Sequence, residues 1–429
     1  MTANRTLIVI GLGAAILAAQ PKGQPTLRTV ASLNQYNQPA GIIEGSPGVF
    51  YSITSGNVFS VTSRGTMSTL AVPATGAQVI SEVVSGADGR YYSAVESTFS
   101  PQILSVTPSP GSAVIGPVQS IAPAMYQNMP DGAFLGVGLL NSSPYVVRVS
   151  ASGQVTPVYA FPSGERLYSN VVYATDGNYY GVSQQNPATT GYVYRVTPSG
   201  TMTQLYDFPA GSFKGFFGVA ILQASDGNFY GTTPTGGPQG SGTIYKLTPS
   251  GQYTLLYAYE TPRNGGPVAL IEGSDGNLYG ATLGTVGNGH SLLFRISKSG
   301  AYSPVVELTT AYCFCSLVQA SDGVIYGTAI AGGASGAGEI FALDVGLPKP
   351  QPSPLKFSPQ SGAPGTRVRI WGQNLLSASV AFNGVPATVV SNSGSNYVWA
   401  TVPAGATSGP ITVTTPGGAN ATQASFTVQ

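Results

Sequence analysis

The stretch from Ala224 to Thr233, ASDGNFYGTT, places an Asp-Gly pair between two apolar runs. Asp-Gly is typical of a two-residue β-hairpin, because glycine accepts a positive φ freely and aspartate tolerates one. The stretch therefore predicts a type I′ hairpin. Close variants recur along the chain, with a degenerate first copy around Pro47 and turn aspartates at Asp88, Asp131, Asp176, Asp226, Asp275 and Asp322.

The repeats predict a ring of small sheets. Their turns lie about 41 to 50 residues apart, which is the length of a propeller blade. The copy that begins near Val219 reads as four strands, VAILQAS, NFYGTT, TIYKLTP and YTLLYAY. The seventh copy lacks a fourth strand, whereas TLRTVASL at Thr26–Leu33 resembles one. We therefore expect an all-β fold, a seven-bladed β-propeller over residues 26–346, closed by pairing of Thr26–Leu33 with the strand that contains Phe341.

The best-preserved copy also carries a family resemblance. The run ASDGNFYGTTPTGGPQGSGTIYKLTPSG resembles the GloVer tandem repeat of exported bacterial β-propeller proteins of the choice-of-anchor type. The similarity is clearest from Val171 to Leu343. The resemblance implies an exported repeat protein and supplies no catalytic residue.

The composition and residue pattern of the sequence change after the repeats. Residues 347–354, LPKPQPSP, form a Pro-rich linker that we expect to be extended and exposed, since successive prolines favour the polyproline conformation. Beyond it, FSPQSGAPGTRVRIWGQNL, VAFNGVPATVV, VWATVPAG and GPITVTTPGG alternate apolar and polar residues between turns, as in a small β-sandwich. Residues 355–429 resemble the IPT/TIG family of immunoglobulin-like domains, which implies a spacer or an interaction module.

The N-terminus predicts export. Arg5 precedes the apolar run Leu7–Ala19, which is short for a membrane-spanning helix and is followed by the breaker-rich QPKGQP. We expect residues 1–19 to be a signal peptide, so that the mature protein is secreted or at the cell surface without membrane insertion. The alternative is an uncleaved anchor.

The charge content narrows the choice of partner. Charged residues make up 8% of the chain, against roughly a quarter in an average soluble domain, and the formal net charge is +1. Without a basic surface, nucleic acid is excluded as a partner. We expect an extracellular glycan or protein instead.

Few residues are suited to catalysis or metal binding. His290 is the only histidine, and Cys313 and Cys315 are interpreted as packing residues. We expect neither a metal nor a cofactor. Calcium is the alternative for the turn residues, but each turn offers about two oxygens where calcium needs six or more. The residues concerned are Asp176, Asn178, Asp226, Asn228, Asp275 and Asn277.

A ring of polar or amphipathic residues is predicted three positions before the turn. Its members are Glu44, Ser85, Asn128, Tyr173, Gln223, Glu272 and Gln319. If the first strand of each blade is innermost, they line a central channel, either as a hydrogen-bonded collar or as an axial ligand site. Glu44 and Glu272 are also the candidate acids of an alternative function, an extracellular enzyme that acts on polysaccharide, for which their carboxylates must converge.

The main hypothesis is a non-enzymatic binding or structural module. In a four-stranded blade the Asp-Gly and Ser-Gly turns lie at one end, here named the turn side. The longer loops lie at the other end, the loop side. Aromatic and Arg residues on the loop side are the types that carry binding energy. The candidate ligand-binding residues there are Arg166, Tyr168, Lys214, Phe216, Arg263, Asn264 and His290.

Overall fold

The computed structural model describes residues 24–429 except for a set of short segments. The segments left out are 34–38, 55–56, 72–77, 80, 87, 98–99, 108–111, 118–121, 130, 141–142, 168–169, 185–189, 213–219, 261–265, 285–289, 309–315 and 392–395. The predicted signal peptide, residues 1–19, lies outside the described residues. Every described element is a β-strand, so the predicted all-β class is confirmed. Within the described residues, no helix meets the length and apolarity that a membrane span requires.

The described residues before position 347 form seven antiparallel sheets, numbered here as sheets 1 to 7. Sheet 1 contains β2 (Ala40–Ser46), β3 (Val49–Ile53), β4 (Val58–Thr62) and β5 (Met67–Ala71). Sheet 2 contains β6 (Gln78–Val79), β7 (Val84–Ser85), β8 (Tyr91–Ser97), β9 (Ser100–Val106) and β10 (Ser112–Pro117). Sheet 3 contains β11 (Ala122–Asn128), β12 (Phe134–Leu140), β13 (Ser143–Val149) and β14 (Val155–Ala160).

The remaining four sheets repeat this order. Sheet 4 contains β15 (Arg166–Leu167), β16 (Val172–Tyr173), β17 (Tyr179–Gln184), β18 (Gly191–Val196) and β19 (Met202–Phe208). Sheet 5 contains β20 (Ile221–Gln223), β21 (Phe229–Thr233), β22 (Thr243–Leu247) and β23 (Tyr253–Ala258). Sheet 6 contains β24 (Pro267–Glu272), β25 (Leu278–Thr282), β26 (Ser291–Ile296) and β27 (Tyr302–Leu308). Sheet 7 contains β28 (Leu317–Gln319), β29 (Ile325–Ala329), β30 (Glu339–Asp344) and β1 (Thr26–Ser32).

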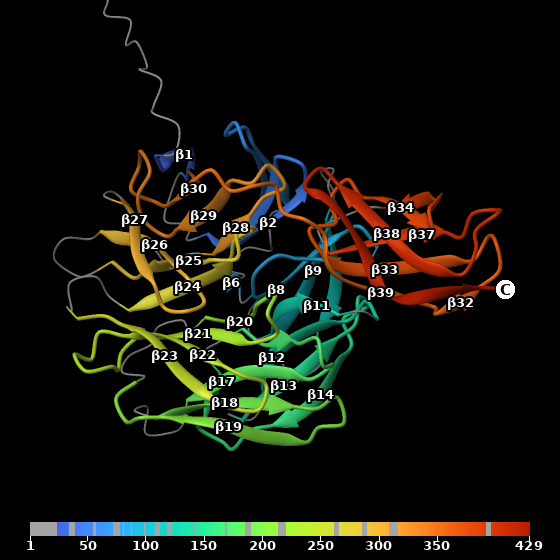
Figure 1. Cartoon of the computed structure of the whole chain (residues 1–429). Coiled ribbons are helices and arrows are strands. Elements are labelled where there is room, and N and C mark those ends of the chain that lie inside the picture. Colours follow the sequence, from blue (N-terminus) through green and yellow to red (C-terminus); the bar gives the residue numbers. More distant parts are fainter. Residues whose placement is uncertain are drawn as a thin grey trace, which may run out of the picture.

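The fourth strand of sheet 7 comes from the N-terminal end of the repeats. β1 pairs antiparallel with β30, with Thr26 opposite Asp344 and Thr29 opposite Phe341. The predicted pairing of this segment with the strand of Phe341 is confirmed. Figure 1 shows β1, in blue, beside β30, in orange.

The sheets contact one another in chain order through the strands that directly precede the first hairpin turn. These strands are β2, β7, β11, β16, β20, β24 and β28; each contacts the next in this series, and β28 also contacts β2. Aromatic rings fill the interfaces: the ring centroids of Phe50 and Tyr326 lie 4.1 Å apart between sheets 1 and 7, and those of Tyr180 and Phe229 lie 4.1 Å apart between sheets 4 and 5. These large buried rings supply much of the apolar area that holds neighbouring sheets together.

The Asp-Gly hairpins differ from the predicted type I′ turn. In the Asp-Gly turn of sheet 5 only Gly227 has a positive φ, of 79°, and its amide donates to Ala224 O across 2.9 Å. This is a type I turn followed by a glycine bulge, a three-residue hairpin loop. Asp226 keeps a negative φ because its Oδ1 accepts from the amide of Asn228 and its Oδ2 accepts from the hydroxyl of Tyr230. The aspartate is therefore fixed by its side chain.

A β-sandwich follows the seven sheets. One of its sheets contains β31 (Ser353–Ser358), β33 (Arg367–Gln373), β37 (Tyr397–Thr401) and β36 (Thr388–Ser391). The other contains β32 (Ser361–Gly362), β39 (Gly418–Val428), β38 (Gly409–Thr415), β34 (Ser379–Phe382) and β35 (Val385–Pro386). The sandwich has its own buried core, which includes Phe357, Ile370 and Phe426.

The linker before the sandwich is only partly the exposed segment that its prolines predict. Pro350 and Pro352 are buried, and the carbonyl of Pro348 accepts hydrogen bonds from Ser274 Oγ and Gln319 Nε2. The polyproline conformation leaves backbone carbonyls free to accept, and side chains of sheets 6 and 7 use them. The expectation of an exposed linker over residues 347–354 therefore holds for Pro348, Lys349 and Gln351 but was wrong for Pro350 and Pro352.

Two turn glycines generate a stability prediction, Gly65 in the second turn of sheet 1 and Gly177 in the Asp-Gly turn of sheet 4. A Cβ on Gly65, which has φ of 92°, would lie 2.3 Å from the carbonyl oxygen of Val30 in β1, whereas a Cβ on Gly177, with φ of 85°, would meet nothing within 4 Å. Gly177→Ala should therefore lose only the cost of a left-handed alanine, about 1–2 kcal/mol. Gly65→Ala should lose more, because β1 must also move. Urea unfolding of both variants measures the difference, and equal losses would contradict the close contact with β1.

Candidate functional site

The ring of residues three positions before the turn joins neighbouring sheets. In four cases the side-chain oxygen accepts a hydrogen bond from the backbone amide that precedes the turn aspartate of the previous sheet. We name these contacts the inter-sheet clamps. They are Thr175 N to Gln223 Oε1 (2.8 Å), Ser225 N to Glu272 Oε2 (2.7 Å), Ser274 N to Gln319 Oε1 (2.8 Å) and Ser321 N to Glu44 Oε2 (2.6 Å).

The two glutamates of the ring are engaged in these clamps. Glu44 also accepts from Ser321 Oγ and Gly48 N, and only 5% of the residue is exposed. Glu272 also accepts from Ser225 Oγ and forms an ion pair with Lys298. Glu44 lies between sheets 7 and 1, and Glu272 lies between sheets 5 and 6, so the two carboxylates belong to different interfaces.

Burial dominates the electrostatics of Glu44. Loss of solvent raises the pKa of its carboxyl group, and the hydrogen bonds from Gly48 and Ser321 offset only part of that increase. A raised pKa often marks a catalytic acid. Here the same carboxylate oxygens are already shared among three protein donors, which gives Glu44 a structural role in holding sheet 1 against sheet 7.

The other ring members have varied surroundings. The amide of Tyr173 donates to Gln127 Oε1 of sheet 3 across 2.9 Å, so a glutamine one position earlier serves this interface. Ser85 is buried, and the side chain of Asn128 lies outside the described residues.

The turn aspartates and asparagines bind one another. Asn228 Nδ2 donates to Asp226 Oδ2 across 2.9 Å, and the corresponding pairs in sheets 4 and 6 do the same. Burial raises the pKa of Asp226, but hydrogen bonds from Asn228 and Tyr230 outweigh it and hold the pKa below its usual value. No group of three or more His, Cys, Asp or Glu side chains converges within the part of the chain that the structure describes. The Asp oxygens thus serve the turn.

The predicted loop-side residues are only partly described. Arg166 is exposed in β15, opposite Gln184 at the end of β17 that lies away from the Asp-Gly turn. His290 Nδ1 lies 3.6 Å from Glu307 Oε2. Both residues are therefore on the loop side as expected. The remaining candidates and both cysteines lie outside the described residues: Tyr168, Lys214, Phe216, Arg263, Asn264, Cys313 and Cys315.

The sandwich contacts the turn side of the seven sheets. Tyr397 donates its hydroxyl proton to Gly86 O of sheet 2, and Arg369 NH2 donates to Met129 O of sheet 3 across 3.2 Å. Lys356 Nζ donates to Thr175 O of sheet 4. In Figure 1 the orange-to-red sandwich lies beside the strands near β2, β8 and β11. Alternation within β33 and β37 predicts which side chains point outward, but no sequence pattern indicates this partner surface.

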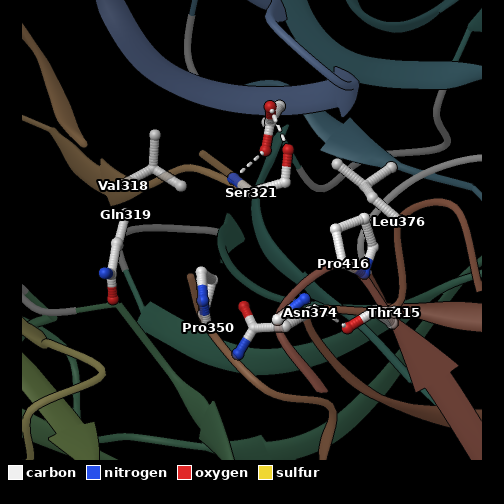
Figure 2. A pocket seen from close by; sticks show the side chains of 10 residues that line it. Val318, Gln319, Ser321, Pro350, Asn374, Leu376, Thr415 and Pro416 are labelled. Atoms are coloured by element: carbon white, nitrogen blue, oxygen red, sulfur yellow. Dashed lines mark hydrogen bonds between the residues drawn. The ribbon is translucent and has the colours of Figure 1, made fainter. Parts of the chain in front are cut away.

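A small pocket lies where the sandwich meets sheet 7. Figure 2 shows Val318 and Ser321 on one side and Asn374 and Leu376 of the sandwich on the other, with dashed lines from Ser321 to the Glu44 carboxylate. The pocket encloses about 50 Å³. Ligand sites commonly measure about 300–1,000 Å³, so this one has room for a few water molecules only.

Comparisons with known proteins agree with this architecture. Residues 123–341 match the model of the Gloeobacter/Verrucomicrobia repeat, and residues 352–428 match that of the IPT/TIG domain. The chain is similar in structure to the catalytically inactive virginiamycin B lyase of Staphylococcus aureus with quinupristin, with a TM-score of 0.55, 18% identity, and coverage of 75% of this chain and 99% of the lyase. It is also similar to a fungal alcohol oxidase of the AA5 family in complex with copper, with a TM-score of 0.52, 12% identity, and coverage of 94% and 98%. No curated protein sequence matches the chain.

The raised pKa of Glu44 leads to a prediction about how stability depends on pH. Because its pKa is raised in the folded protein above the unfolded value of 4.5, folding binds a proton, and the contribution of Glu44 to stability falls as the pH rises through that interval. Glu44→Gln does not ionise. The difference in the free energy of unfolding, variant minus wild type, should therefore become more positive from about pH 4 to about pH 7. Urea unfolding across this range measures the difference, and a constant or opposite difference would refute the sign.

Tyr397 generates a prediction about docking. Tyr397→Phe removes the hydroxyl that donates to Gly86 O and accepts from Gly89 N. The loss should weaken docking by about 1–3 kcal/mol, since buried backbone groups lose their partner. Hydrogen exchange at the Gly89 amide should become faster, while exchange in the sandwich core around Ile370 stays unchanged. Unchanged exchange at Gly89 would show that the contact does not hold the two parts together.

Proposed function

Because the chain belongs to the Gloeobacter/Verrucomicrobia repeat family and carries an IPT/TIG domain, we propose that it is an exported, non-enzymatic binding or structural module. The seven sheets form the platform for a ligand or partner. The IPT/TIG domain closes one end of that platform. The partner class that fits the low charge of the chain is an extracellular glycan or protein.

We propose further that the seven sheets are the blades of a closed seven-bladed β-propeller. The pairing of β1 with β30 supports this arrangement, because it joins the two ends of the repeat region. The contact of β28 with β2 adds further support. The inter-sheet clamp from Ser321 to Glu44 lies at the same junction. A ring held by a covalent chain at six junctions and by β1 at the seventh is closed, and its sheets keep only short outer edges.

The observation that carries the non-enzymatic proposal is the engagement of Glu44 and Glu272 in separate clamps. A glycoside hydrolase needs two carboxylates that flank one bond, about 5–10 Å apart. These two side chains are instead directed at backbone amides of different sheets. The alternative, an extracellular enzyme acting on polysaccharide through this pair, therefore has less support.

The position of the IPT/TIG domain favours the loop side for binding. Its contacts with Gly86, Met129 and Thr175 cover the turn side of sheets 2 to 4. The opposite end stays accessible, and Arg166 and His290 lie there. The likeness to virginiamycin B lyase adds an enzymatic candidate, but at 18% identity it supports the fold alone.

Thermal shift of residues 24–429 against panels of glycans and peptides tests this proposal. Binding to the native state should raise the melting temperature in a saturable way. Once a ligand is found, the triple variant Arg166→Ala, Lys214→Ala and Arg263→Ala should lose most of its affinity. Arg90→Ala, an exposed change on the turn side, is the matched control.

The enzymatic alternative is tested in the same experiment. Any polysaccharide in the panel is assayed for new reducing ends. Release that is abolished by Glu44→Gln or Glu272→Gln in a folded protein would overturn the proposal in favour of the enzyme. Full affinity in the folded triple variant would overturn the loop-side location.

A further inference from the structure

A charged groove lies on the turn side between sheets 7 and 1, away from the loop side. It encloses about 290 Å³. Two cations and two anions line it, together with a small residue and a tyrosine: Arg28, Arg64, Asp322, Asp344, Ala342 and Tyr326. Four charges in one groove are unusual for a chain in which only 8% of residues are charged.

The equivalent place in other sheets is filled by a side chain of the protein. In sheets 3 to 6 the third strand carries a cation opposite the second strand, namely Arg148, Arg195, Lys246 and Arg295. Arg148 forms an ion pair with Asp131, and Lys246 Nζ lies 3.7 Å from Asp226 Oδ2. In these two sheets the cation neutralises the turn aspartate.

Sheet 7 departs from this pattern at one position. Ala342 occupies the third strand opposite Tyr326, where sheets 3 to 6 carry the cation and sheets 1 and 2 carry uncharged residues. In sheet 7 the cation is Arg28, which lies one strand farther out, in β1, directly opposite Ala342. The outer strands of sheets 3 to 6 carry a hydroxyl residue there instead, namely Thr156, Thr203, Thr254 and Ser303. The displacement leaves a hollow over Ala342.

The charges around this hollow are available for a ligand. Among the described residues, neither Asp322 nor Asp344 forms an ion pair. Asp322 accepts hydrogen bonds from the Val324 amide and the Tyr326 hydroxyl, and Asp344 accepts one from the Gly346 amide, so neutral donors alone contact the two carboxylates. Arg28 uses one N–H to reach Ser63 O, across 3.0 Å, and keeps its other donors. Arg64 is exposed in the adjoining turn, where sheets 3 to 6 carry serine.

We infer that this groove binds a small zwitterion, a molecule that carries an ammonium group together with a carboxylate. The ammonium group takes the place over Ala342 that Lys246 fills in sheet 5, beside Asp322 and Asp344. The carboxylate binds to Arg28 and Arg64, since guanidinium groups pair with carboxylates through two parallel N–H donors. A ligand with one charge alone leaves half of the groove unpaired. This site is separate from the loop side, so the outcome of its test does not depend on the proposed function.

A series of ω-amino acids, from glycine to 6-aminohexanoate, provides the probes. Calorimetric titration at low salt, where screening of exposed charges is weak, measures their binding to residues 24–429. At least one member should bind with a dissociation constant on the order of 1 mM. It should bind at least tenfold more tightly than the alkylamine and the alkanoate of the same length. Binding no tighter than that of either control would overturn the inference.

Two variants locate the site. Ala342→Arg restores the residue type of sheets 3, 4 and 6, fills the hollow and should weaken binding at least tenfold. Arg64→Ser restores the turn residue of sheets 3 to 6 and should weaken binding of the zwitterion while leaving that of the alkylamine unchanged. Ser303→Arg adds the same charge to the outer strand of sheet 6 and is the matched control, with unchanged affinity expected. Full affinity in folded Ala342→Arg, or equal losses in all three variants, would place the binding elsewhere.

Discussion

The hydrogen bond from the backbone of one sheet to the side chain of the next is the contact on which the arrangement of the sheets depends. Each sheet has a similar backbone, and apolar packing between sheets tolerates small sliding movements because it has no direction. The inter-sheet clamps add direction, since an amide must meet a particular oxygen. They also explain why the ring position accepts both glutamine and glutamate: what the neighbouring amide requires is one acceptor oxygen, which both residues provide.

The use of glutamate at two of these positions has a local cause. Glu272 is matched by Lys298, and Glu44 by additional donors from Ser321 and Gly48. A buried carboxylate is tolerated when such donors satisfy it, and otherwise it opposes folding. The same arrangement explains why two acidic residues that look like a catalytic pair in the sequence are separated in the fold. Their partners lie on different sheets, and each partner holds its glutamate at that interface.

The strands and the pairing of β1 could be predicted because they follow from local patterns. Alternation and turn residues define Phe229–Thr233 and its neighbours, and the absent fourth strand of the last copy points to Thr26–Leu33. The turn type could not be predicted, because it depends on whether Asp226 is held by its own side chain. The docking of the sandwich depends on Arg369 and Tyr397 meeting backbone carbonyls more than 200 residues away in the sequence. Most of the proposed loop-side residues lie outside the described residues, so their placement stays a prediction.

Repetition itself decides where a ligand site can arise in such a protein. When every sheet carries the same residues, each charge has the same internal partner, as Asp226 has Lys246. A ligand site can arise in a sheet that keeps a charged residue but has lost the oppositely charged partner found in other sheets. Sheet 7 is built from the two ends of the repeat region, and its outer strand is therefore free to differ from the strands that follow a Ser-Gly turn. In the internal sheet 2, where Ser105 takes the place of the third-strand cation, Arg90 pairs with Asp88 instead. In sheet 7, where Ala342 takes that place and Arg28 stands one strand farther out, Asp322 forms no ion pair among the described residues.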